Sequence, residues 1–138
     1  MSVKSDVLTM LEKQRGNYFS GEQLAEQLHV SRAAVWKAVG ALKKEGYEIL
    51  AGPNRGYCLP EDSDILSEEG IRNYLPEECR SMHIEVYRET TSTNTIAKQA
   101  ANEGVAAPAV YVAGMQTAGR GRRGRSFLSV PGGNICMS

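Results

Sequence analysis

The chain has 138 residues, of which 16 are Lys or Arg and 16 are Asp or Glu, so its formal net charge at pH 7 is zero. This length fits one ordinary domain or two small ones. Bulk charge favours no particular partner, so any binding of nucleic acid or phosphate must come from local arrangement. No apolar stretch approaches the ~20 residues needed to span a bilayer, and no signal-peptide pattern is present. We expect a cytoplasmic protein with no membrane partner.

The cysteines and histidines form no metal-binding pattern. Cys58, Cys79 and Cys136 are far apart and include no C-x-x-C pair, and His29 and His83 are not spaced to complete a metal site. Reduced, buried thiols are the expected state, because free cysteine behaves as a small apolar residue. We therefore predict no metal ligand.

Three helices are predicted at the start of the chain. The first covers about residues 4–14. The second follows Ser20-Gly21-Glu22-Gln23, which has the form of a capping box, and ends near Leu28. The third covers about residues 32–44 and has Ser31 as its N-cap. A short capped helix, a very short turn and a basic helix are typical of a helix-turn-helix.

The third predicted helix has two different faces. Val35, Ala38, Val39 and Leu42 repeat at helical spacing and are expected to pack against the first two helices. The opposite face suits a helix that enters a DNA groove and contacts phosphates, although a simple solvated face is the alternative. That face carries Arg32, Ala33, Trp36, Lys37, Gly40 and Lys44.

A hairpin is predicted after the third helix. Apolar residues alternate at Tyr47 and Ile49 and again at Tyr57 and Leu59, around the turn of residues 52–56. Three helices and a hairpin make a winged helix, which binds DNA or, alternatively, serves as a protein-docking module. Arg55 is expected near the tip of the wing, within reach of a phosphate or the minor groove. The predicted DNA-binding residues are Ser31, Arg32, Ala33, Trp36, Lys37, Lys44 and Arg55.

The acidic, proline-containing stretch of residues 59–64 indicates a domain boundary, which gives domains of residues 1–62 and 63–138. In the second domain a strand, a helix and a strand follow one another, as at the start of an α/β or α+β sheet. The expected elements are a short helix from Ser67 that Pro76 ends, a strand around Ile84–Tyr87, a helix over Thr95–Glu103 and a strand over Ala109–Met115.

The stretch AGRGRRGR, residues 118–125, contains G-x-G-x-x-G and nearly matches a nucleotide phosphate loop. Both motifs need a helix after the glycines. Here Pro131 and the pair Gly132-Gly133 prevent a long helix, no acidic residue follows for a ribose, and Arg125 replaces the required lysine. The dinucleotide and phosphate-loop interpretations therefore fail.

A mobile cationic loop remains as the interpretation of this stretch. Arg120, Arg122, Arg123 and Arg125 can each offer a bidentate fork to phosphate or carboxylate. Four like charges repel, so we expect the loop to be disordered until an anion binds. An arginine/glycine segment that binds RNA without specificity is the alternative.

These motifs together resemble the bifunctional biotin protein ligases that also act as biotin operon repressors. The similarity covers nearly the whole chain. It implies an α+β fold, with an N-terminal winged helix-turn-helix followed by an incomplete mixed α/β sheet of a catalytic domain. It rests on the helix-turn-helix sequence around Ser20-Gly21-Glu22-Gln23-Leu24 and Ser31–Lys37, on Gly56-Tyr57-Cys58-Leu59-Pro60, on Ser92-Thr93-Asn94 and on Gln116–Arg125.

The resemblance implies a two-step reaction. Biotin and ATP, with Mg²⁺ for the ATP step, give biotinyl-5′-AMP, and a lysine of a biotin carboxyl carrier protein then takes the biotinyl group. The adenylate also acts as corepressor, so that a homodimer forms and binds operator DNA. The implied catalytic residues are Arg120 and Arg122, and the implied ligand-binding residues are Ser92, Thr93, Asn94, Gln116, Gly119, Arg120, Gly121, Arg122 and Phe127.

The chain departs from the family pattern in several places. Phe127 stands where the family often has tryptophan, Ser126 replaces a common basic residue, and Trp36 is bulky for a helix that reads a groove. The later lysine-containing motif, the rest of the sheet and the C-terminal barrel do not follow, so we expect this 138-residue chain not to ligate biotin. A winged-helix transcriptional regulator that senses a small anionic ligand is the alternative function.

Overall fold

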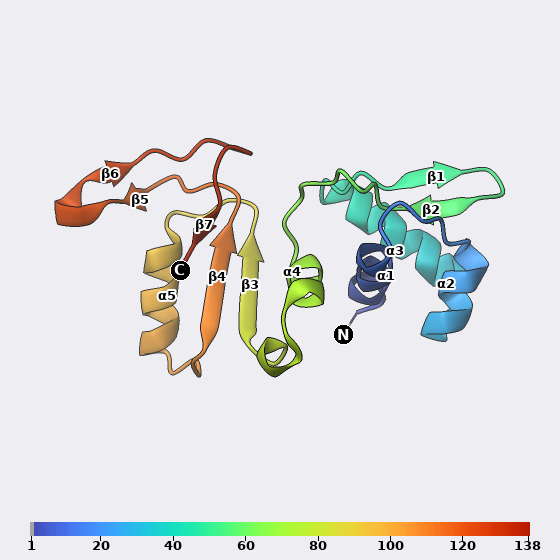
Figure 1. Cartoon of the computed structure of the whole chain (residues 1–138), viewed down its shortest axis with the longest axis horizontal. Coiled ribbons are helices and arrows are strands. Elements are labelled where there is room, and N and C mark those ends of the chain that lie inside the picture. The colour runs from blue at the N-terminus through green and yellow to red at the C-terminus, as the bar shows by residue number, and fades with distance from the viewer. Residues whose placement is uncertain (1) are drawn as a thin grey trace. The chain divides into compact units, whose positions relative to one another are not determined.

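A computed structural model describes residues 2–138, and the chain divides into two compact units. The first unit contains the residues up to Ile65 together with Glu69–Tyr74. The second contains Leu66–Glu68 and Leu75–Ser138. Figure 1 shows helices and a hairpin in the first unit and a small sheet with one flanking helix in the second. The expected α+β fold with an N-terminal winged helix is confirmed.

The first unit begins with three helices and a hairpin. The helices are α1 (Val3–Lys13), α2 (Gly21–Leu28) and α3 (Arg32–Lys44), and the antiparallel strands are β1 (Leu50–Gly52) and β2 (Gly56–Cys58). This is the predicted winged helix, with the β1–β2 hairpin as the wing (Figure 1). A further helix, α4 (Glu68–Tyr74), follows after the wing.

Local capping fixes the helix-turn-helix. The Ser20 hydroxyl accepts a hydrogen bond from the Gln23 backbone at 3.0 Å, and the Gln23 side chain accepts one from the Ser20 backbone at 2.9 Å, which confirms the capping box. α2 ends where His29 adopts a left-handed conformation at φ 55°. The Ser31 hydroxyl then accepts from the Ala34 backbone at 3.1 Å and starts α3. Only three residues therefore separate the two helices.

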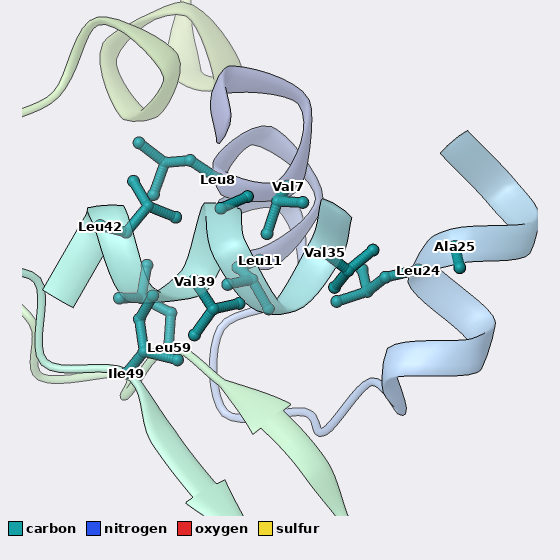
Figure 2. Packing of buried hydrophobic residues seen from close by; sticks show 11 residues of the cluster. Val7, Leu8, Leu11, Leu24, Ala25, Val35, Val39, Leu42, Ile49 and Leu59 are labelled. Atoms are coloured by element: carbon teal, nitrogen blue, oxygen red, sulfur yellow. The ribbon is translucent and has the colours of Figure 1, made fainter. Parts of the chain in front are cut away.

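All three helices and both ends of the wing contribute to one apolar core (Figure 2). The predicted inward face of α3 is buried, which confirms its helical periodicity. Removing apolar surface from water is the main stabilising contribution to such a small unit. The cluster consists of Val7, Leu8, Leu11, Leu24, Ala25, Val35, Ala38, Val39, Leu42, Ile49 and Leu59.

A buried ion pair ties the segment after the wing to α1. Glu12 is buried, and the Arg15 Nε donates to its carboxylate at 2.9 Å. This hydrogen bond raises the pKa of Arg15, while partial burial opposes it. The other end of the Arg15 guanidinium donates to the Ser63 carbonyl at 2.6 Å. Residue 63 is thus held to the first unit by charge-assisted hydrogen bonds.

The second unit contains a mixed three-stranded sheet in the order β3-β4-β7. A short 3₁₀ helix, η1 (Glu77–Cys79), precedes β3 (His83–Tyr87), which pairs in parallel with β4 (Ala109–Ala113). β7 (Cys136–Met137) adds to β4 in the antiparallel direction. The helix α5 (Thr93–Asn102) connects β3 to β4 and packs against β4 and β7 (Figure 1).

The arginine-rich stretch forms a small hairpin, which differs from the disordered loop expected from its repelling charges. β5 (Gly119–Arg120) and β6 (Ser126–Phe127) pair in the antiparallel direction around η2 (Arg122–Gly124). Arg123 and Gly124 have positive φ at the turn. We call residues 119–127 the arginine hairpin. No helix follows the glycines, in agreement with the rejection of both nucleotide motifs.

Several predicted boundaries are wrong by one to three residues. α1 begins and ends one residue before the predicted bounds. α5 begins at Thr93 instead of Thr95, because the Ser92 carbonyl already accepts the first helical hydrogen bond. β4 ends at Ala113 instead of Met115, since only an isolated bridge joins the chain to its neighbour beyond that point. The first wing strand begins at Leu50, so the alternation that starts at Tyr47 reflects packing on the core.

Candidate functional site

The outward face of α3 is the first candidate site. All six residues predicted on this face are exposed, and Trp36 is the most conspicuous because 71% of its surface is accessible. α3 carries no acidic residue, and two lysines lie in its last turn. This face therefore combines positive charge with one large apolar side chain, and nothing in the first unit covers Trp36.

The wing brings a further cation to the same unit. Arg55 is exposed in the turn between β1 and β2, and its guanidinium carbon lies 5.9 Å from the centre of the Tyr18 ring, within cation–π range. The root of the wing is fixed by two backbone hydrogen bonds between Phe19 and Tyr57, at 2.8 and 2.7 Å. Gly56 permits this close approach because it has no Cβ atom, which would lie 2.0 Å from the Phe19 carbonyl oxygen.

The predicted DNA-binding residues thus lie in two places. Six of them are on α3 or form its N-cap, and Arg55 is separate, on the wing. Ser31 is committed to capping, because its hydroxyl accepts from the helix backbone. Tyr18, which contacts the wing arginine, is not among the predicted residues. A lone tyrosine in a loop gives no sequence signal for such a contact.

The second candidate site lies where β3 and β4 end. Ser92 and Thr93 are buried at the start of α5, and Gln116 follows β4. The Gln116 side-chain oxygen accepts two hydrogen bonds, from the Thr93 backbone at 2.8 Å and from the Thr93 hydroxyl at 3.0 Å. Carboxyl ends of parallel strands are the usual place for a ligand in such sheets.

The base of the arginine hairpin lies next to Gln116. Gly119 is buried, and a Cβ atom added to it would lie 2.7 Å from the Phe127 carbonyl oxygen and 3.1 Å from the Gln116 side-chain nitrogen. Thr93, Gln116 and Gly119 are therefore brought together.

The arginines are placed differently. All four arginines of the hairpin are exposed, as is Phe127, and the hairpin extends beyond the strand ends (Figure 1). Within residues 2–138, none of these arginines has an ion pair with an acidic side chain. Residues 104–138 contain no acidic residue at all. The hairpin is thus a local concentration of unneutralised positive charge.

Two serines of this network were missed from the sequence. The Ser129 hydroxyl accepts from the Gln116 backbone at 3.1 Å and contacts the Cys136 sulfur at 3.6 Å. The Ser138 hydroxyl donates to the Asn94 side chain at 2.5 Å and lies 2.8 Å from the Thr93 hydroxyl. Serines carry no spacing that would have indicated these roles. Their contacts depend on how β7 pairs with β4, because Ser129 contacts Cys136 of β7 and Ser138 directly follows this strand.

Two tyrosines of the second unit have raised pKa values. A hydrogen bond to Glu85 raises the pKa of Tyr87 to about 12, and burial raises that of Tyr111. Cys58 and Cys136 are buried thiols as predicted, whereas Cys79 is half-buried.

Among residues 2–138, no group of three or more His, Cys, Asp or Glu side chains could hold a metal ion. No helix in this range is long and apolar enough to cross a membrane.

The fold and these two sites define the class of the protein. A family model described as an HTH domain matches residues 3–58, which span α1 to the end of β2. The chain therefore contains a winged helix-turn-helix domain followed by an α/β unit with a polar strand-end site and a cationic hairpin.

Comparison with known proteins finds similar sequences over nearly the whole chain. The chain is 34% identical over 137 residues to the bifunctional ligase/repressor BirA of Bacillus subtilis (strain 168), covering 99% of this chain and 42% of that protein. It is 36% identical over 123 residues to BirA of Escherichia coli (strain K12), covering 89% and 37%. The probable transcription repressor NiaR of Thermotoga maritima is 39% identical over 61 residues, covering 44% and 34%.

The chain is thus similar, over nearly its whole length, to the N-terminal part of these bifunctional ligase/repressor proteins. It spans about two fifths of the length of these ligase/repressor relatives.

Proposed function

We propose that the first unit binds operator DNA and that the chain acts through it as a transcriptional repressor. The observation that carries the proposal is the outward face of α3, where Arg32, Lys37 and Lys44 are exposed and no acidic residue is present. Lysine and arginine beside a groove-binding helix neutralise phosphates and release counterions. Arg55 on the wing supplies a second contact, to the backbone or the minor groove.

The test is duplex binding measured by fluorescence anisotropy over a series of salt concentrations. Lys37→Ala should weaken binding and reduce the slope of log K against log salt by about one unit, because one phosphate contact is lost. Lys13→Ala removes an exposed lysine from the end of α1 and is the matched control, with an unchanged slope expected. If Lys37→Ala keeps the original slope, Lys37 does not contact a phosphate.

We further propose that the second unit forms the first part of a ligase site for biotin and ATP. Ser92, Thr93 and Asn94 would line the biotin end, and Gln116 would orient the ligand. The Thr93–Gln116 hydrogen bonds support this assignment, because they join the two strand ends into one polar surface. Gly119 supports it as well, since a side chain there would overlap the Phe127 carbonyl oxygen and crowd the Gln116 amide.

The arginine hairpin would then hold the negative charge of the reaction. Biotin carboxylate attacks the α-phosphate of ATP and pyrophosphate leaves, after which a carrier-protein lysine displaces AMP from biotinyl-5′-AMP. Arg120 and Arg122 would donate to carboxylate and phosphate oxygens, where preorganised donors stabilise developing charge. Gly121 and Phe127 would supply backbone room and an apolar wall. Mg²⁺ would offset triphosphate charge when bound, and no residue of this chain is assigned to it.

The ligase proposal is tested by calorimetry with a biotinyl-5′-AMP analogue, on a protein extended to the length of the relatives. Arg122→Ala should reduce the binding heat strongly, whereas Lys98→Ala on the exposed face of α5 should not. Adenylate-dependent dimerisation and biotin transfer to a carrier protein are measured in parallel. An extended wild-type protein that gives no heat would contradict the proposal. We expect the 138-residue chain to show no ligation.

A second candidate function is a winged-helix regulator that senses a different small anion. The similarity to the Thermotoga repressor, which covers 44% of this chain, favours it. In that case the arginine hairpin binds a phosphate or carboxylate but the protein transfers no biotin. Heat with another anion and none with the adenylate analogue would select this function.

A further inference from the structure

Trp36 is the only tryptophan in the chain, and its indole is 71% exposed on α3. Trp36 is the one large apolar side chain exposed on α3, and an aromatic ring offers a partner a large contact area. Two of its neighbours on the helix surface are small, because Ala33 lies three residues before it and Gly40 lies four residues after it, while Arg32 lies four residues before it. A Cβ added at Gly40 would meet no atom within 4 Å. The indole therefore projects from a shallow part of the helix surface.

The charges on α3 are arranged around this indole. At about 3.6 residues per turn, Ala33, Trp36 and Gly40 project from the middle of the exposed face. Arg32 lies on one side of this line, and Lys37 and Lys44 lie on the other. Cations at both edges can reach the two phosphate backbones that border a groove. The apolar middle then faces the base edges.

The base edges offer one apolar group in the major groove, the C5-methyl of thymine. An indole has no acceptor and only one donor, so it cannot read guanine or cytosine by paired hydrogen bonds. It can bury a methyl group. We propose that Trp36 determines sequence preference by covering a thymine methyl in each half-site. This inference rests on the proposed DNA binding of the first unit.

The test compares thymine with deoxyuridine, which lacks only the methyl group. A duplex is first selected from a random library with the wild-type chain, and each thymine is then replaced in turn by deoxyuridine. At one position in each half-site the replacement should weaken wild-type binding about fourfold, the value for losing one buried methyl group. Trp36→Ala should bind the thymine and deoxyuridine duplexes equally, and Trp36→Phe should keep part of the difference.

Fluorescence gives a second readout, because all tryptophan emission comes from this indole. DNA binding should protect it from acrylamide quenching, and Lys13→Ala should behave as wild type. Failure of the wild-type chain to bind any selected duplex would refute the proposed function itself. Binding with no deoxyuridine effect at any position, an equal effect in Trp36→Ala, or an indole that stays fully accessible to quencher in the complex would each overturn the inference alone.

Discussion

Gly56→Ala is the sharpest test of how the wing is attached. Gly56 has φ +97°, and a Cβ added there would lie 2.0 Å from the Phe19 carbonyl oxygen. The left-handed backbone alone costs about 1–2 kcal/mol for a residue with a side chain. Relieving the overlap also requires Phe19 and Tyr57 to separate, which loses two backbone hydrogen bonds of about 1 kcal/mol each. We expect a total loss of about 3–4 kcal/mol.

The free energy of unfolding is measured by urea titration followed by far-ultraviolet circular dichroism, which reports mainly the helices of the first unit. Gly40→Ala is the matched control, because it adds the same methyl group in open space on a helix. It should stabilise the chain by about 0.5–1 kcal/mol through helix propensity. A Gly56→Ala variant within about 1 kcal/mol of wild type would refute the close packing of the wing root.

Three further predictions follow from other contacts. Leu24→Ala should cost about 2–5 kcal/mol of stability, because Leu24 is fully buried, whereas Leu50→Ala on the exposed strand should cost under about 0.5 kcal/mol in the same urea titration. Spectrophotometric titration should show that Tyr87 has a pKa of about 12, and Glu85→Gln should lower this pKa. Because the folded state favours the neutral phenol of Tyr87, its contribution to the free energy of unfolding is complete below about pH 10 and is lost as the pH rises through about 12. Tyr18→Leu should weaken duplex binding about two- to fivefold by releasing Arg55, and Tyr18→Phe should not, because phenylalanine keeps the ring.

The winged helix could be predicted because its determinants are local. The capping box joins residues three positions apart, and the buried face of α3 repeats at the helical period. The boundary errors arise where local and tertiary effects compete. Ser92 starts α5 earlier than the apolar stripe indicates, and Ile49 is buried by the helical core instead of by a strand partner.

The strand-end network could not be predicted in the same way. The Thr93–Gln116 bonds join residues 23 positions apart, and the Ser138 contacts span 44 and 45 positions. The Ser138 contacts exist only once β7 pairs with β4, and the Thr93–Gln116 bonds only once β3 and β4 pair. The arginine hairpin was missed for a different reason: its turn places Arg123 at φ 60°, a conformation that Asn, Asp or Gly normally signals.

The zero net charge of the chain conceals how its charges are divided. Half of the 16 basic residues lie in two segments that contain no acidic residue, α3 and the arginine hairpin, so all 16 acidic residues lie elsewhere. At physiological salt the field of an exposed charge falls off within about 8 Å, so distant acidic residues hardly weaken attraction at either segment. Phosphate can therefore be attracted locally although the whole molecule has no net charge to steer it from afar. The affinity of each site should accordingly depend on salt through its own few arginines and lysines, and changing acidic residues outside these two segments should leave the salt slope unaltered.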